Sequence, residues 1–403
     1  MTHRDYDNAL LTQIRNAAGT VLSMSETFTF DYIASKVPAE DMKDIEHVYL
    51  TGCGDSYCIG IAAAPCFENE FSHTDGGYYA LRADAMRNIE FTRYHNTYSG
   101  WNEEEAKKSL VCAVSITGSP ARPREALLRM MALGGKAVAF TDNEASPFAK
   151  AAKYAIRLNV PQDYYKPGIT DEECPGMTSY IAGAYAVMMF GLYVNVCKGY
   201  LTMEEAEEQR QGAIEYAKMY TQEVIDKIEE QVFPVVCKWE ENGFDQMDFI
   251  SEGQEFATAF FGSAKMVESF GAVTTNDDAE DWCHINYFNR HPGRIVTFVV
   301  ANESSNSFSR DVETVNCIAA IKRPCMVVTD ADASHFPEGV TVITLPKPKY
   351  RWANALLQHI PIDLVAAYIG IFRKANPVGI GSQAHETDAE CKRFKQSEIV
   401  IVK

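Results

Sequence analysis

The sequence predicts an α/β protein in which one unit, a parallel sheet with helices on both faces, occurs twice. From residue 47 onward, short strand-like runs of apolar residues alternate with segments of helical periodicity. Such alternation is typical of a parallel sheet whose two faces are both covered. The same succession returns after residue 241, for which an internal duplication is the economical explanation.

The composition is that of a folded globular protein. The chain has 403 residues, of which 46% are hydrophobic and 23% charged, enough for two ordinary domains. The N-terminal stretch lacks the plan of a signal peptide, and no apolar run reaches the roughly 18 residues of a membrane helix, so we expect no membrane partner. The 11 cysteines are scattered, which favours buried thiols in a reducing cytoplasm.

The charge and the motifs exclude several classes of partner. A net charge of −18 argues against nucleic acid and would repel anionic substrates at long range. A phosphate site must therefore use local dipoles and a few cations. No CxxC or HxxxH spacing occurs, and no metal or organic cofactor is expected.

The first half of the chain contains the first sheet. Residues 1–46 are expected to form a helical arm, because apolar residues at 6–22 have near-helical spacing. Strands are expected near 48–51, 110–115, 137–141 and 154–160, and an edge strand is a candidate near 78–82. Helices are expected at 123–133 and 180–197, followed by a charged helical linker that includes 203–227.

The second half repeats this plan. Strands are expected at 247–250, 295–300, 325–329 and 340–345, and the helix at 360–372 corresponds to the one at 180–197. The predicted division is a helical arm at 1–46, a first domain at 47–200, a helical linker at 201–240, a second domain at 241–375 and a tail at 376–403. Within the tail, 398–402 has a β-like pattern.

Two turns in the first half suit a phosphate group. The turn GCGDS at 52–56 follows a strand and begins a helix, so that free N–H groups and the positive helix end point to one place. The turn SITGSP at 115–120 also follows a strand and offers three hydroxyl groups. The carboxyl ends of parallel strands share one edge of a sheet, so the turns should converge. The first turn alone, however, is equally compatible with an ordinary strand-to-helix connection.

The corresponding turns of the second half have lost the features that suit the first two turns to phosphate binding. There, SEGQ replaces GCGDS and NESSNS replaces SITGSP. We therefore expect one phosphate site per chain, in the first half.

The second half instead carries groups suited to proton transfer. Lys265 and Glu268 are three residues apart and should share a helix face, and His284 follows 16 residues later. A basic run that ends at Lys395 lies near the C-terminus. A carboxylate, an imidazole and amines are the groups needed to open a sugar ring, move protons or form a Schiff base. By spacing alone, a surface ion pair and a structural histidine are the commoner outcomes.

The two turns, the doubled unit and KMVE with its histidine resemble the tandem sugar isomerase (SIS) domain family. The likeness is to the isomerase half of glucosamine-6-phosphate synthase and to the fructosamine-6-phosphate deglycases, and it covers nearly the whole chain. The resemblance implies two flavodoxin-like parallel sheets. It also implies phosphate binding by the two turns, on residues Gly54, Ser56, Ser115, Thr117 and Ser119.

The resemblance also assigns catalytic roles. Glu268, beside Lys265, would shuttle the proton between C1 and C2, and His284 would open the ring of a sugar bound by the other subunit of a homodimer. Lys395 would contact the carbonyl of the open sugar. Further substrate contacts are implied for Asp55, Glu173, Thr178 and Ser179.

Some positions depart from the family pattern. Pro120 stands where a hydroxyl is usual, so that one phosphate contact is lost, and Ile285 and Asn286 replace the usual Gly-Pro after the histidine. These changes suggest a substrate other than fructose 6-phosphate. No glutamine amidotransferase domain precedes the pair, so we do not expect glutamine-dependent amination.

The expected activity is that of an aldose–ketose isomerase/deaminase or a deglycase on a keto- or aminosugar 6-phosphate. The residues do not separate these reactions. The alternative is a non-catalytic phosphosugar-binding sensor, for which a neighbouring DNA-binding domain would be expected. A dinucleotide-dependent enzyme would need a GxGxxG turn, which the chain lacks.

Overall fold

The computed structural model describes residues 2–68, 81–97, 102–162, 174–377 and 397–402. The chain forms two compact units, each assembled from three segments. The first-sheet unit comprises Thr20–Pro161, Ser179–Ile214 and Thr387–Lys403, and the second-sheet unit comprises Met1–Gly19, Gln162–Thr178 and Glu215–Glu386.

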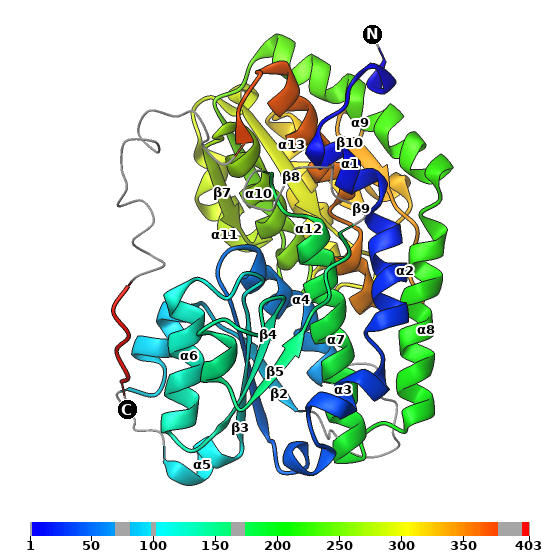
Figure 1. Cartoon of the computed structure of the whole chain (residues 1–403). Coiled ribbons are helices and arrows are strands. Elements are labelled where there is room, and N and C mark those ends of the chain that lie inside the picture. The colour runs from blue at the N-terminus through cyan, green and yellow to red at the C-terminus, as the bar shows by residue number, and fades with distance from the viewer. Residues whose placement is uncertain (1, 69–80, 98–101, 163–173, 378–396, 403) are drawn as a thin grey trace. The chain divides into compact units, whose positions relative to one another are not determined.

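Each unit contains one parallel sheet, and within the described residues each sheet has five strands (Figure 1). The first has the order β2-β1-β3-β4-β5 and the second the order β10-β9-β8-β6-β7. Counted from the first strand of each unit, both orders are the same flavodoxin-like order. The predicted fold class and the predicted repetition of one α/β unit are therefore confirmed. The strands are β1 His47–Thr51, β2 Arg82–Ala85, β3 Ser109–Val114, β4 Lys136–Thr141, β5 Tyr154–Arg157, β6 Gln246–Ile250, β7 Thr274–Asp277, β8 Ile295–Val300, β9 Cys325–Thr329 and β10 Thr341–Thr344.

Helices cover both faces of each sheet. Those with most or all of their residues in the first-sheet unit are α2 Ala17–Thr27, α3 Phe30–Lys36, α4 Asp55–Glu68, α5 Glu103–Lys107, α6 Ala121–Ala132, α7 Thr178–Lys198 and α8 Met203–Met219. Those of the second-sheet unit are α1 Ala9–Arg15, α9 Gln222–Asn242, α10 Phe256–Phe270, α11 Ala279–His284, α12 Phe308–Ala320 and α13 Ile360–Phe372.

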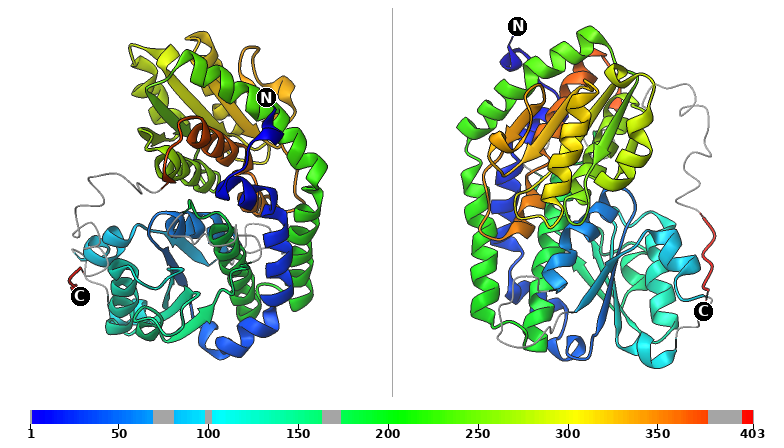
Figure 2. Two further views of the ribbon diagram at one scale, coloured as in Figure 1. Left: turned by 45° about the horizontal axis from the view of Figure 1, so that its top comes forward. Right: turned by 180° about the vertical axis from the view of Figure 1, so that it is seen from behind.

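Helices lie on both faces of the first sheet (Figure 2), and alternating side chains of its strands pack into two cores. On one face, Tyr49 and Val111 pack against Leu127 of α6. On the other face, the Phe140 ring lies 5.4 Å from the ring of Phe190 in α7. Successive residues of a strand point to opposite faces, so strands buried on both sides are apolar throughout.

The second sheet is covered in the same way. Val299 and Val327 share a buried cluster with Val315 of α12. On the opposite face, the ring of Phe298 lies 5.7 Å from Trp239 of α9. The helices α10, α12 and α13 thus occupy the places of α4, α6 and α7 in the repeated plan.

Several element predictions need correction. The charged segment at 203–227 is not one helix: α8 ends at Met219, and Thr221 caps α9 by accepting a hydrogen bond from the Val224 N–H. The apolar pattern at 6–22 likewise divides between α1 and α2. The edge strand β2 begins at Arg82, and residues 78–80 lie outside the described part. Residues 398–402 form no strand, and β7 was not predicted, because its four residues are polar and half-buried.

The expectation that no apolar run reaches membrane-helix length is wrong. Two segments, Thr178–Lys198 and Arg351–Phe372, are long and apolar enough by composition. In both, 89% of the most apolar window is buried inside the protein. They are the core helices α7 and α13, with a short helical turn before α13, and their apolar character follows from burial within the fold.

Candidate functional site

The two hydroxyl-bearing turns follow adjacent strands. They lie at the carboxyl ends of β1 and β3, which pair in parallel register. The helices that follow these strands, α4 and α6, cover opposite faces of the sheet. This is the topological switch point of the first sheet, where ligands bind in open α/β folds.

Glycine makes both turns possible. A Cβ on Gly52 would lie 2.4 Å from Cβ of Ser56, so only glycine allows this approach. Gly118 has a φ of +66°, and a Cβ there would lie 2.3 Å from the Ser146 hydroxyl. Both turns therefore require the glycines that the sequence supplies.

The predicted phosphate-binding residues differ in exposure. Ser56 and Ser115 are 9% and 5% exposed and stand at the two strand ends. Gly54, Thr117 and Ser119 are exposed, and the Ser119 N–H donates to Oγ1 of Thr117 at 3.2 Å. Asp55 begins α4 and is half-buried. The topology thus brings the two turns to one edge of the sheet.

A pocket of about 420 Å³ adjoins these turns. Its walls come from both turns, from the segment after β2 and from the C-terminal segment, and its lining residues are Cys53, Ile89, Arg93, Pro120, Arg122, Ser397 and Glu398. None of the predicted phosphate-binding residues is among them. The two arginines were not predicted. Arg122 lies two residues past the SITGSP turn, whereas no local pattern marks Arg93.

A buried carboxylate holds both arginines. Glu125 of α6 is fully buried and accepts two hydrogen bonds from Arg93, at 2.7 Å and 3.1 Å, and another from Arg122. Burial alone would raise the pKa of Glu125, but hydrogen bonds from Arg93 and from the Val400 N–H hold it below the ordinary value. Burial raises the pKa of the neighbouring Cys53 thiol. The Glu125 carboxyl group is therefore ionised at neutral pH, whereas the Cys53 thiol is neutral.

The C-terminal segment 397–402 is held by α6 through its main chain. The Val400 N–H donates to Glu125 at 2.7 Å, and the Val402 carbonyl accepts from Arg129 Nε at 2.8 Å. Arg122 donates to the Glu398 carbonyl. Residues 122, 125 and 129 are spaced to share one helix face.

In the second-sheet unit, the Lys265–Glu268 pair is in contact. Lys265 Nζ lies 2.5 Å from Oε2 of Glu268, as the spacing of three residues predicted. The lysine side chain is fully buried, whereas that of Glu268 is 34% exposed. Nζ also donates to the Gly176 carbonyl at 3.3 Å and lies 4.7 Å from the centre of the Phe261 ring. The pair is therefore not an ordinary surface ion pair.

His284 is the last residue of α11, and its side chain is 67% exposed. Its Nε2 lies 2.8 Å from Oε1 of Glu280, one turn earlier. The helix α11 is anchored by the buried side chain of Trp282, whose indole N–H donates a hydrogen bond to Asp248 at 3.2 Å. Asp248 also accepts from the buried Arg323 at 2.7 Å. The buried contacts among Trp282, Asp248 and Arg323 therefore hold α11 in place, and the His284 imidazole at its end lies at the surface.

Of the four remaining predicted residues, two are buried and two lie outside the described part of the chain. Glu173 and Lys395 lie outside the described residues. Thr178 and Ser179, at the start of α7, are buried. The Thr178 N–H donates to Gln13 at 2.9 Å, and its hydroxyl has no hydrogen-bond partner among the described residues.

The switch point of the second sheet is acidic. Glu252 and Glu255 follow β6, and Asp311 lies in the first turn of α12, which follows β8. Burial and the neighbouring Glu252 charge raise the pKa of Asp311 to about 8. Burial also raises the pKa of Glu255. Carboxylates therefore occupy the edge at which the first sheet carries hydroxyl groups. Among the described residues, no cluster of three or more His, Cys, Asp or Glu side chains is arranged to hold a metal ion.

Comparison with known proteins gives matches to solved structures alone. No family model and no curated protein matches the chain. The C-terminal domain of glucosamine-fructose-6-phosphate aminotransferase from Francisella tularensis matches with a TM-score of 0.73 and 13% identity, covering 94% of this chain and 100% of that one.

Two further structures show the same arrangement. Glucosamine-6-phosphate deaminase from Thermotoga maritima matches with a TM-score of 0.62 and 14% identity, covering 92% of this chain and 97% of that one. Tagatose-6-phosphate ketose/aldose isomerase from Escherichia coli matches with a TM-score of 0.63 and 12% identity, covering 92% and 94%. The chain therefore has the fold of the tandem sugar isomerase domain proteins, as the sequence resemblance predicted.

Proposed function

We propose that the chain is an enzyme that acts on a phosphorylated keto- or aminosugar, as an isomerase/deaminase or as a deglycase, without glutaminase activity. The contact between Lys265 and Glu268 carries the proposal. A fully buried ammonium group is costly unless a carboxylate compensates it, and here the compensating Glu268 keeps 34% of its side chain exposed. This arrangement holds one carboxylate in a fixed position at the surface of α10.

Glu268 is suited to proton transfer. Its Oε2 accepts from Lys265, whereas Oε1 accepts no hydrogen bond from another described residue. In the proposed reaction, Oε1 removes a proton from the carbon next to the carbonyl carbon, which gives an enediolate, and returns this proton to the former carbonyl carbon. The hydroxyl proton on the first carbon moves at the same time to the oxygen of the former carbonyl, so that C1 and C2 exchange their oxidation states. A positioned carboxylate of this kind contributes about 10²- to 10⁴-fold to the rate.

The other residues hold the substrate and prepare it. Ser56, Ser115, Thr117 and Ser119 bind the phosphate group, with the N–H groups around Gly54, and Asp55, Glu173, Thr178 and Ser179 contact the sugar. His284 opens the sugar ring at the site of a second subunit, and Lys395 engages the carbonyl carbon. The placement of the hydroxyl turns at the switch point of the first sheet supports the phosphate assignment.

The comparisons support the substrate class. The similar structures are described as an aminotransferase, a deaminase and an isomerase of sugar phosphates. Their shared fold, together with the Lys265–Glu268 contact, favours an enzyme of this kind in the cytoplasm. The ten described cysteines are free thiols, in keeping with a reducing compartment.

The test compares Glu268→Gln with Ser115→Ala. Glu268→Gln removes the proton acceptor, so we expect turnover of the preferred sugar phosphate to fall by at least about 100-fold while its affinity stays within a few-fold. Ser115→Ala removes a donor to the anion and should weaken binding by about tenfold. Isothermal titration and a coupled assay of product formation measure both.

The alternative, a non-catalytic phosphosugar sensor, predicts a different result. A sensor would bind the ligand in a Ser115-dependent way without turnover in the wild-type chain. Wild-type turnover that Glu268→Gln leaves unchanged would remove Glu268 from its proposed role.

A further inference from the structure

The pocket beside the two turns has two arginines among its lining residues. Arg93 comes from the helical turn after β2, and Arg122 from the first turn of α6. Their side chains are 28% and 16% exposed. The pocket volume of about 420 Å³ is large enough for a small ligand or for one end of a larger one.

Positive charge exceeds buried negative charge at this place. Two guanidinium groups share one fully buried carboxylate, that of Glu125. Glu398 also lines the pocket, but it is exposed, and water screens its charge. A local excess of positive charge stands out in a chain whose net charge is −18.

Glu125 fixes both arginines and leaves donors unused. It accepts from Nε and Nη2 of Arg93 and from Nη1 of Arg122, while the Glu398 carbonyl accepts from Nη2 of Arg122. No described residue accepts a hydrogen bond from Nη1 of Arg93 or Nε of Arg122. A guanidinium group has five N–H donors in a rigid plane, a geometry that matches the oxygens of phosphate and carboxylate.

We propose that this pocket is a subsite for an oxyanion of the ligand, bound by Arg93 and Arg122. The inference rests on the proposed function, because it assigns the group to a ligand that the neighbouring turns also bind. Pro120 removes a hydroxyl from the second turn and forms part of the pocket wall. The arginines supply hydrogen-bond donors beside that position. The oxyanion is either a phosphate group or a carboxylate group, and it is carried by the sugar or by its amine substituent.

The test is isothermal titration of the full chain with three probes. These are inorganic phosphate, glucose 6-phosphate and fructosyl-glycine, which carries a carboxylate and no phosphate. Arg122→Met and Arg93→Met should each lower the affinity for at least one probe by about tenfold or more. Arg122→Lys keeps the charge but loses the planar fork, so it should recover part of the affinity.

Arg157→Met is the matched control. Arg157 lies on β5 in the same unit, is 51% exposed, and lies 3.7 Å from Asp142. Its loss should leave the affinity for all three probes unchanged. Melting curves without ligand check folding, and Arg122→Met retains the Arg93–Glu125 pair in case Arg93→Met does not fold.

The outcomes separate the sources of the oxyanion. Weaker binding of both phosphate probes identifies the group as phosphate, and weaker binding of fructosyl-glycine alone identifies it as carboxylate. The subsite is overturned if both methionine variants bind every probe as tightly as the wild type, or if the wild type binds none. The proposed function fails separately, when sugar phosphate turnover is absent or does not depend on Glu268.

Discussion

Asp311 is a carboxyl group kept largely neutral by its surroundings. It is 1% exposed and lies near Glu252 and Glu255, and its pKa of about 8 is well above the ordinary value of about 4 for an aspartate. Between these two values the folded state binds the proton and the unfolded state does not. The free energy of unfolding contributed by Asp311 therefore falls as the pH rises from about 4 to about 8.

The variant Asp311→Asn should remove this dependence. The wild type should melt at lower temperature at pH 9 than at pH 6, and Asp311→Asn should show a smaller decrease and melt above the wild type at pH 9. Differential scanning calorimetry measures both. Glu313→Gln, on the same helix and 66% exposed, is the control. Equal pH dependence in wild type and Asp311→Asn would contradict the assignment.

Single residues were predictable where the partners lie close in sequence. The Lys265–Glu268 contact follows from helical spacing alone. The contact of Arg93 with Glu125 joins residues 32 positions apart, one in the helical turn after β2 and the other in α6. No local pattern contains such a pair, because the fold alone brings its members together.

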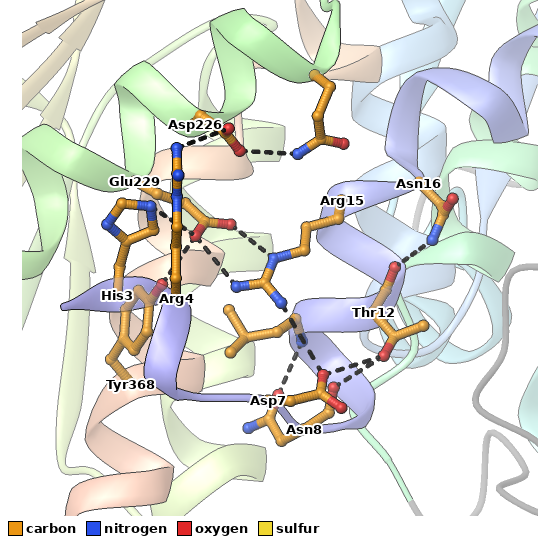
Figure 3. A network of polar contacts seen from close by, with 12 residues as sticks. His3, Arg4, Asp7, Asn8, Thr12, Arg15, Asn16, Asp226, Glu229 and Tyr368 are labelled. Carbon is orange, nitrogen blue, oxygen red and sulfur yellow. Dashed lines mark hydrogen bonds and ion pairs between the residues drawn. The ribbon is translucent and has the colours of Figure 1, made fainter. Parts of the chain in front are cut away.

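At the scale of elements, a buried network joins three helices of the second-sheet unit (Figure 3). Arg15 of α1 donates twice to Glu229 of α9, at 3.0 Å and 3.1 Å, and the Tyr368 hydroxyl of α13 donates to Glu229 at 3.0 Å. Glu229 is 1% exposed. The beginning of the predicted helical arm is thus attached to two helices of the second-sheet unit.

Glu229→Ala should destabilise that unit. It leaves Arg15 and the Tyr368 hydroxyl without their shared acceptor. Because Arg15 is 27% exposed and lies 4.0 Å from Asp7, we expect a cost of about 1–3 kcal/mol. Asp226→Ala is the control. Its pair with Arg4 is exposed, with side-chain exposures of 33% and 68%, and should contribute less than about 1 kcal/mol. Urea unfolding midpoints compare the two variants, and similar midpoints would contradict a stabilising role for the network.

Elements were predictable where burial imposes a pattern. The apolar strands β3 and β8 and the core helix α13 follow the prediction closely, because residues buried on several sides must be apolar. The strand β7 and the break between α8 and α9 were missed. The strand β7 forms through backbone pairing of polar residues, and the break is set by the capping residue Thr221. Neither feature produces a periodic pattern of hydrophobic residues in the sequence.

At the scale of the whole molecule, the two units share one plan but differ in charge at the functional edge. The first sheet has hydroxyl groups and arginines there, and the second has carboxylates. The repeated pattern of strands and helices predicted two parallel sheets, and the resemblance to the sugar isomerase domains supplied their flavodoxin-like strand order. The arginine pocket was not predictable, because four separate segments of the chain form it.

The proposed homodimer should be observed in solution. Ile285 and Phe288, next to His284, are 64% and 71% exposed, and large apolar side chains of this kind favour an interface. Sedimentation velocity should give twice the chain mass of 44.9 kDa. Phe288→Ser should weaken the dimer, whereas Met203→Ser, at a residue 46% exposed on α8, should not. A monomeric wild type would contradict the assignment of His284 to a second subunit.

The contacts of 397–402 have a consequence for how this segment can vary. Its carbonyl and N–H groups, present in almost any amino acid, make the bonds to Arg122, Glu125 and Arg129. Substitutions within it should therefore be tolerated during divergence, with proline at position 400 the exception, since it has no N–H. Insertions or deletions would shift the register of those bonds and should be selected against. We therefore expect evolution to conserve the length and register of this segment more strongly than its amino-acid sequence.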